Sequence, residues 1–134
     1  MRNMFFAGLF SLPSIVFAAN VSFVGNYGLE FSNNPKEPAV VVSGSDDQLT
    51  VKVTGEDDTS SAKIVDAEKM KALWERLSFT NAPDGATCIK FSRDYLCHID
   101  PAMKKTETGL ASIQSEFFFY SITQDTPVTA FPLK

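Results

Sequence analysis

The chain contains two cysteines, Cys88 and Cys97, and the segment between them has the pattern of a tight β-hairpin. If the turn falls at Ser92–Arg93, the cysteines lie directly opposite each other, where their Cβ atoms are close enough for a disulfide. Two cysteines allow only one pairing. The alternatives are a reactive thiol or a metal pair, but this spacing is not that of a zinc site and the lone His98 cannot complete four ligands. We therefore predict a structural disulfide between Cys88 and Cys97.

The first eighteen residues have the parts of a secretory signal peptide. Arg2 is followed by a short apolar stretch, and Val16 and Ala18 fit the −3 and −1 positions of a cleavage site. The alternative is a retained membrane anchor, but the stretch is broken by a proline and is shorter than the ~20 residues that a span needs. We predict that residues 1–18 are removed and that residues 19–134 form a single exported domain, periplasmic or secreted, without membrane insertion. Such a compartment also favours the disulfide.

The charge balance limits the classes of partner. The chain has 12 Lys and Arg residues against 16 Asp and Glu residues, which gives a formal net charge of −4. Nucleic acids and anionic membrane surfaces bind proteins that have a basic surface, so we expect neither as the main partner. With 44% hydrophobic and 21% charged residues, the composition is that of a globular domain and excludes a disordered tail or a coiled coil.

Apolar alternation predicts strands in the first half of the domain. Residues 21–23 and 27–31 have the pattern of half-buried strands, with a bend or turn at Gly25–Asn26. The β-branched runs 39–43 and 49–54 predict a hairpin, because turn residues join them. The second run alternates strictly, so one of its faces is expected to be buried and the other to meet water.

An amphipathic helix is predicted near residues 67–77. Asp66 can cap its first free N–H groups. A single apolar stripe follows at helical spacing, formed by Met70, Leu73, Trp74 and Leu77. We expect this stripe to pack on the sheet, with a partner-binding face as the alternative.

The second half of the domain predicts further strands. Residues 86–91 and 95–99 form the arms of the cysteine hairpin, and residues 101–105 suit one short helical turn after Asp100–Pro101. The run 113–122 carries aromatics on both faces, which indicates a strand covered on both sides or a face used by a partner. Residues 128–131 lie between two prolines and predict a short strand at an edge.

These segments predict an α+β fold with a mostly antiparallel sheet of about six to eight strands, partly closed, and one helix packed on it. The order of strands, helix and further strands resembles that of OB-type barrels such as the bacterial toxin B subunits. The resemblance lies in element order alone, and it implies a closed or nearly closed sheet.

The sequence lacks the patterns on which common catalytic sites depend. Cys97 and His98 are neighbours in a strand and point to opposite faces, so they cannot form a nucleophile–base pair. His98 and Asp100 share a face at roughly 7 Å, which suits an orienting pair at best. The sequence has no Gly-x-Ser-x-Gly, phosphate-binding glycine loop, zinc-protease motif or dinucleotide motif. We expect no catalytic residue, no cofactor and no metal site.

Two acidic turns, residues 46–47 and residues 56–58, are the remaining candidates for a site. They flank one predicted strand and are therefore about 20 Å apart at ~3.3 Å per residue. Nothing hydrophobic lies beside either turn to raise the pKa of a carboxyl group, so we interpret both as solvated surface. As partner contacts we predict Asp46, Asp47, Glu56, Asp57 and Asp58.

A small exported acidic domain without catalytic parts is most simply a binding protein. We favour an inhibitor or immunity protein that neutralises a toxin, an effector or a cell-wall hydrolase in the bacterial envelope, because acidic turns suit a basic cleft. A monomer or homodimer would fit this hypothesis. The alternative is a secreted virulence or host-interaction module, an adhesin or a ring-forming toxin subunit, with residues 117–120 as its contact patch. A hydrolase that acts through the acidic turns is the third possibility.

Overall fold

The computed structural model describes residues 21–45 and 47–134. The predicted signal peptide, residues 1–18, and the predicted contact residue Asp46 lie outside the described residues. No helix in the described ranges is long and apolar enough to cross a membrane.

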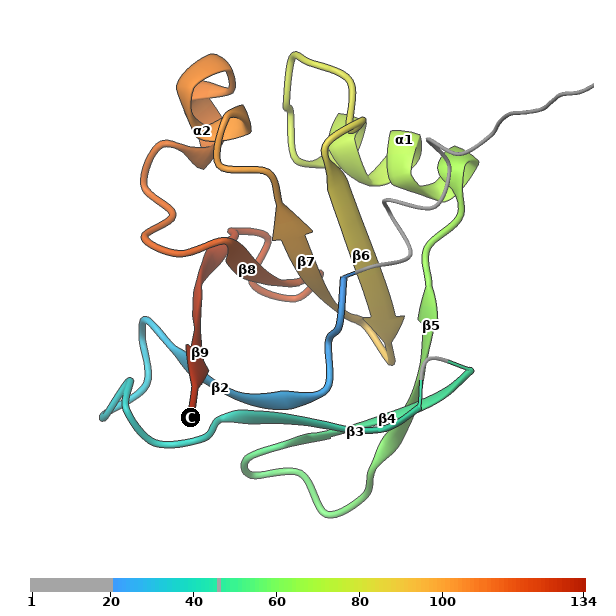
Figure 1. Cartoon of the computed structure of the whole chain (residues 1–134), viewed down its shortest axis with the longest axis vertical. Coiled ribbons are helices and arrows are strands. Elements are labelled where there is room, and N and C mark those ends of the chain that lie inside the picture. The colour runs from blue at the N-terminus through green and yellow to red at the C-terminus, as the bar shows by residue number, and fades with distance from the viewer. Residues whose placement is uncertain (1–20, 46) are drawn as a thin grey trace, which may run out of the picture.

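The described chain forms an antiparallel β-barrel (Figure 1). Each strand pairs with the next in sequence, and the last pairs with the first, which closes the sheet. The eight strands are β2 (Gly25–Leu29), β3 (Val40–Ser45), β4 (Gln48–Val53), β5 (Ser60–Ile64), β6 (Ala86–Phe91), β7 (Asp94–Ile99), β8 (Phe117–Ser121) and β9 (Val128–Leu133). The predicted α+β, mostly antiparallel fold is confirmed. The strands follow one another around the barrel in chain order, so the topology is up-and-down and differs from the Greek-key order of OB-type barrels.

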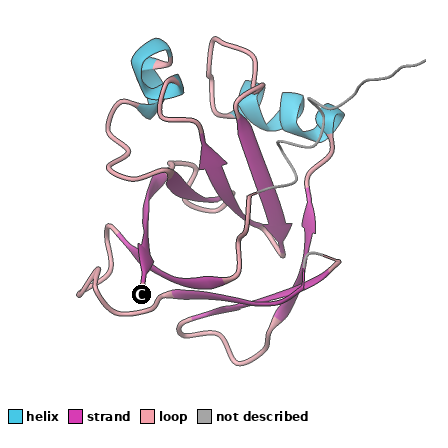
Figure 2. Ribbon diagram, in the orientation of Figure 1, coloured by secondary structure: helices cyan, strands magenta, loops and turns pink. Residues whose placement is uncertain are grey.

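Helical segments lie near one end of this barrel (Figure 2). They are α1 (Ala67–Arg76), α2 (Met103–Thr106) and the short 3-10 helix η4 (Thr108–Leu110). α1 begins where predicted, because the Asp66 side chain accepts a hydrogen bond of 2.9 Å from the backbone N–H of Lys69. It ends one residue earlier than predicted, with Leu77 as its C-cap.

Side chains that alternate along the strands fill the barrel interior. On β4, Leu49 and Val51 are buried while Thr50 is exposed, as the sequence pattern predicted. The interior cluster consists of Phe23, Tyr27, Val40, Val42, Leu49, Val51, Ala62, Ile89, Phe91, Leu96, Phe119, Val128 and Ala130. Burial of these apolar side chains provides the main driving force for the fold.

A second apolar cluster lies between α1 and the outer face of the sheet. Met70, Leu73 and Trp74 of α1 pack with residues of β6, β7 and β8 and of the segment that includes η4. The disulfide between Cys88 and Cys97 belongs to this cluster, and the two residues are direct partners in the ladder. Both the predicted disulfide and the predicted use of the helix stripe in the core are confirmed.

The aromatic strand β8 is covered on both faces. Phe119 packs in the barrel interior, whereas Phe118 and Tyr120 pack in the cluster beneath α1. These three residues are at most 7% exposed. Of the two interpretations of this run, burial on both sides is therefore correct, and residues 117–120 do not form an exposed contact patch.

The first described segment packs against the barrel interior. Phe23 is buried and packs edge-on against Phe117, with ring centroids 6.1 Å apart. The Tyr27 ring packs against the same phenylalanine at 5.1 Å, and its hydroxyl donates a 2.8 Å hydrogen bond to the carbonyl of Phe23. The prediction of a strand over residues 21–23 is wrong, because this segment lies outside the ladder, and Gly25–Asn26 begins β2 instead of forming a bend.

Two other strand predictions need correction. β5 was not predicted, because Ser60–Ile64 lacks the β-branched and aromatic pattern of the other strands. β9 was predicted at an edge, but it pairs with β2 on one side and with β8 on the other. Pro132 occupies a ladder position opposite Tyr27, where a proline cannot donate a hydrogen bond. The closed ladder therefore tolerates one proline in its last strand.

Candidate binding site

Four connections between strands meet at one end of the barrel, which we call the loop end. Because the strands alternate in direction, these connections all lie opposite the end that carries α1 and α2. They are residues 30–39, 54–59, 92–93 and 122–127. In Figure 1 the β2–β3 loop and the β4–β5 turn project at the lower edge, away from both helices.

The loop end surrounds an open cavity of about 750 Å³. Apolar side chains of the strands, including Leu29, Val53, Phe119 and Val128, form its inner wall, and residues from all four connections form its rim. Mouths of β-barrels are frequent binding sites, since a concave apolar floor there meets polar groups on the loops. The loop end is therefore the candidate binding site.

The β2–β3 loop is held close to the barrel by its backbone. A Cβ atom at Gly28 would lie 1.7 Å from the carbonyl oxygen of Pro35, so only a glycine lets the loop fold back on β2. The Ser32 hydroxyl donates a 2.8 Å hydrogen bond to the carbonyl of Leu29. This loop presents Phe31, which is 75% exposed and lines the cavity rim. The sequence pattern predicted Phe31 as part of a half-buried strand, and that prediction is wrong.

Acidic side chains lie at the same end of the barrel as this exposed phenylalanine ring. Glu37 and Glu56 line the same cavity as Phe31, and Asp57 and Asp58 follow in the exposed β4–β5 turn. Arg93 is the single basic residue in the described lining of the cavity. The ammonium of Lys52 donates a hydrogen bond to the backbone carbonyl of Glu56 at the base of this turn. The rim therefore combines one large apolar side chain with an excess of negative charge.

Asp94 is an acid of the cavity wall with a shifted pKa. It begins β7 opposite Phe91, a residue of the barrel interior, and it is only partly exposed. Burial raises the pKa of the Asp94 carboxyl, a hydrogen bond from Ser121 opposes this rise, and the charge of Glu56 adds to it. A carboxylate held in a concave site at a cost to its solvation is a frequent property of functional positions.

The β8–β9 turn is attached to α1 by a polar cluster. The buried hydroxyl of Tyr120 donates to the carboxylate of Asp125 and accepts a 2.9 Å hydrogen bond from Nε of Arg76. Nε of Arg76 also lies 3.7 Å from Oδ1 of Asp125. Burial is the largest cause of the raised pKa of Tyr120. These contacts hold one rim segment of the loop end in place.

The predicted contact residues divide between the two ends of the barrel. Glu56, Asp57 and Asp58 lie at the loop end, in the turn between β4 and β5. Asp47 lies at the opposite end, in the turn between β3 and β4, and Asp46 is outside the described residues. The structure therefore does not bring the two acidic turns into one site.

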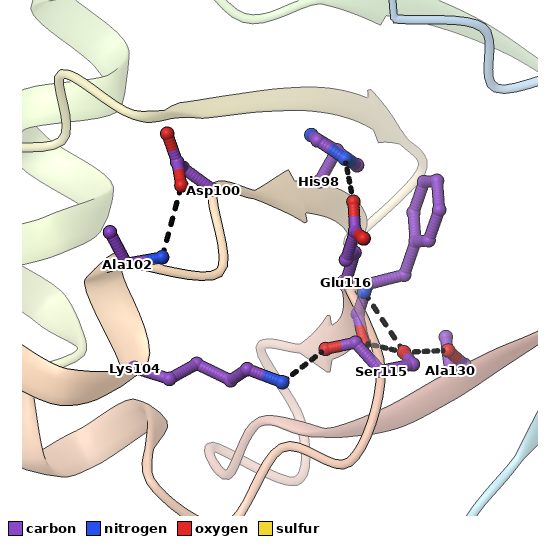
Figure 3. A network of polar contacts seen from close by, with 8 residues as sticks. His98, Asp100, Ala102, Lys104, Ser115, Glu116 and Ala130 are labelled. Atoms are coloured by element: carbon purple, nitrogen blue, oxygen red, sulfur yellow. Dashed lines mark hydrogen bonds and ion pairs between the residues drawn. The ribbon is translucent and has the colours of Figure 1, made fainter.

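His98 and Asp100 do not form the orienting pair that their spacing allowed. Nε2 of His98 lies 3.0 Å from Oε1 of Glu116, whereas the Asp100 carboxylate accepts a hydrogen bond of 3.0 Å from the backbone N–H of Ala102. Figure 3 shows the two side chains directed to these separate partners. The same network includes Lys104, which donates to the carbonyl of Ser115 at 3.1 Å. These contacts stabilise the β7–β8 connection.

The ionisable side chains of the described residues are not gathered into a metal centre. Across residues 21–45 and 47–134, no group of three or more His, Cys, Asp or Glu side chains is arranged to hold a metal ion. Searches with family models, among curated proteins and among solved structures give no match to this chain.

Phe31 and Asp94 are site residues that the sequence pattern did not predict. Phe31 precedes a dense run of turn residues, Ser32 to Pro38, which indicates a loop more strongly than a strand. Asp94 directly follows the predicted hairpin turn, and only the ring closure of the sheet places it at the cavity. The first position had a local signal, whereas the second did not.

Proposed function

We propose that this chain is an exported, non-catalytic inhibitor or immunity protein that binds a toxin, an effector or a cell-wall hydrolase through the loop end. The observation that carries the proposal is Phe31, which stands 75% exposed on the rim of an acidic cavity. Large aromatic side chains are the usual anchors of protein interfaces. Exposed at the mouth of a cavity with apolar walls, this ring is placed to serve as such an anchor.

The charge of the loop end defines the class of partner. Glu37, Glu56 and Asp94 line the cavity, and Asp57 and Asp58 extend the negative surface beyond its rim. A partner with a basic cleft would be attracted to this end before contact, which raises the association rate. Phe31, exposed on the rim of the same cavity, then supplies apolar contact.

Two further observations support an exported binding protein. The buried disulfide between Cys88 and Cys97 is of a kind that persists in oxidising compartments. The single histidine, His98, pairs with Glu116 near the end of β7 that lies opposite the loop end. The loop end therefore contains no histidine, and its charged groups are mainly carboxylates that can meet basic groups of a partner.

A pull-down with matched variants tests the proposal. Wild-type protein immobilised through its C-terminus is expected to capture a basic protein from a cell-envelope extract of the host or of a competitor. Phe31→Ser should weaken that capture by about tenfold or more, as removal of an interface anchor does. Lys105→Ala, on the opposite end of the barrel, is the control and should not weaken it. Equal capture by Phe31→Ser and wild type would contradict the proposal.

Association kinetics and activity measurements complete the test. Reversing charge at Asp57 and Asp58 together should lower the association rate with the captured protein and leave the dissociation rate nearly unchanged. The captured protein should lose its enzymatic or toxic activity when wild type is added in equal amount. A protein that binds but keeps its activity would instead favour a secreted host-interaction module. An oligomer larger than a dimer, identified by its mass in light scattering, would favour that alternative as well.

A further inference from the structure

A second surface of the molecule has the opposite charge to the loop end. A groove of about 620 Å³ runs between α1 and the outer face of β5, β6 and β7. Lys69 and Arg76 contribute from α1, and Lys63 and Lys90 contribute from the sheet. No acidic side chain appears among the described residues that line it. We call this surface the cationic groove.

The lysines of the sheet are placed in an unfavourable arrangement. Lys63 of β5 and Lys90 of β6 are direct partners in the antiparallel ladder, and both are exposed. Like charges at directly opposed positions destabilise a sheet. Among the described residues, neither lysine forms an ion pair, and Lys69 forms none either. The whole chain has a net charge of −4, yet these cations gather in one groove. Among the described residues, Arg76 is the one groove cation that has an acidic partner, Asp125.

The floor of the cationic groove is apolar. Ala72 and Leu73 of α1 and Tyr95 of β7 line it, and Ile64, which is 52% exposed, lies at its edge. The Lys90 ammonium lies 5.7 Å from the centre of the Tyr95 ring, so this lysine is held over the floor. A ligand that fits must therefore offer negative charges on its sides and an apolar group toward the floor.

The spacing of the cations selects an extended ligand. Lys69 and Arg76 are two helical turns apart, which corresponds to roughly 10 Å along α1. A single phosphate group cannot reach both ends of such a row, whereas about three residues of an extended peptide span it. The cations also stand on two walls of a groove, so a strand lying between them meets both, while a flat membrane surface would meet only one side.

From these observations we propose that the cationic groove binds an extended acidic peptide segment of another protein, with apolar side chains between its acidic ones. This surface adjoins the loop end at Ser92 and at the contact of Arg76 with Asp125, but its lining includes neither Phe31 nor the acidic residues of the rim. The proposal does not depend on the function proposed for the loop end. Acidic side chains of the peptide would neutralise the opposed pair Lys63 and Lys90, and an apolar side chain would cover Tyr95 and Ile64.

Fluorescence anisotropy with a defined probe tests this inference. The probe is a fluorescein-labelled synthetic peptide of alternating glutamate and leucine, about eight residues long, and its glutamine analogue is the uncharged control. We expect the wild-type protein to bind the glutamate peptide and not the glutamine analogue, with weaker binding at higher salt. Absence of binding to the glutamate peptide at low salt would overturn the proposal.

Matched charge variants locate the binding. The double variant Lys63→Ala/Lys90→Ala should weaken binding about tenfold, the loss expected for two partly exposed ion pairs. Lys36→Ala/Lys105→Ala changes the net charge equally outside the groove and should leave binding within about twofold, because distant charges are screened. Equal weakening in the two double variants would show that binding follows net charge alone and would refute the assignment.

Two further measurements distinguish peptide binding from the effects of unfolding and of lipid binding. Removing the opposed lysines relieves their repulsion but also removes the contact of Lys90 with Tyr95, so the thermal midpoint of Lys63→Ala/Lys90→Ala should stay close to that of wild type. Weaker binding by a variant with this midpoint cannot come from unfolding. Vesicles containing phosphatidylglycerol should not displace the peptide. If they displace it through Lys63 and Lys90, the groove belongs to an anionic lipid and the peptide assignment is wrong.

Discussion

Oε1 of Glu107 accepts a 2.8 Å hydrogen bond from the backbone N–H of Thr80, a residue 27 positions earlier in the chain. The same oxygen accepts a second bond of 2.9 Å from the backbone N–H of Asn81. Glu107 is only 1% exposed, so this carboxylate is buried and used entirely within the protein. It joins the segment after α1 to the connection between β7 and β8, and thereby fixes the helical end of the barrel.

Replacing this carboxylate should destabilise the fold. Glu107→Ala leaves two backbone donors without a partner and should lower the free energy of unfolding by about 2–4 kcal/mol. Glu107→Gln retains one oxygen that can accept both bonds, so its loss should be clearly smaller. Urea denaturation of the three proteins measures these differences. Equal losses for the two variants would show that the charge of Glu107, and not its acceptor geometry, provides the stabilisation.

Reduction of the disulfide should be slow and should weaken the barrel. The bond closes a short loop, and the chain-entropy relation gives a contribution of about 2.7 kcal/mol. Cys88→Ala/Cys97→Ala should therefore lower the free energy of unfolding by about this amount. Because both cysteines are fully buried, a reductant should act on the native protein only through opening of the β6–β7 hairpin. Alkylation of released thiols over time, with and without mild urea, measures this rate.

Stability should fall in strongly alkaline solution because of Tyr27. Burial raises the pKa of this phenol from 10.0 to about 12. Between these values the unfolded chain releases the proton while the folded chain keeps it, so the stabilisation is complete below about pH 10 and is lost as pH rises toward 12. Two pKa units correspond to about 2–3 kcal/mol. Tyr27→Phe should remove this part of the pH dependence, and its denaturation midpoints at pH 9 and pH 11.5 provide the comparison.

The contribution of Asp94 to stability should also be lost as pH rises, but near the acidic end of the pH scale. Its pKa is raised by burial, so the carboxyl favours folding below its unfolded pKa of about 4, and this benefit is lost as pH rises through the folded value. Asp94→Asn should therefore be more stable than wild type at pH 7 and equal to it near pH 3. Urea midpoints at the two pH values test this. A destabilised Asp94→Asn at pH 7 would mean that the charge is compensated within the isolated protein.

Local pattern was sufficient for the elements whose partners are close in sequence. The hairpin of β6 and β7 has the register deduced from its two cysteines, with Cys88 opposite Cys97 and Lys90 opposite Tyr95. The α1 helix was predicted from its cap and its apolar stripe, since both lie within a few turns. These features depend on neighbours a few residues apart, which a sequence displays directly.

Closure of the sheet depends on a contact that no local pattern displays. β2 and β9 lie about a hundred residues apart, and their pairing gives β9, which was expected at an edge, a neighbour on each side. The proline at 132 indicated an edge because it lacks a donor, yet the strand is paired on both sides. The candidate site follows from this closure, since the cavity exists only where four distant connections converge.

The pairing of Asn26 with Leu133 brings the start of the first described strand and the end of the last one together, at the end of the barrel that faces away from Phe31. A linker or surface attachment placed after Lys134 would therefore leave the acidic rim pointing outward and unobstructed. Copies anchored in this way on a sensor chip or a cell surface would all present the same face to a passing protein. The geometry makes this chain suited to oriented display.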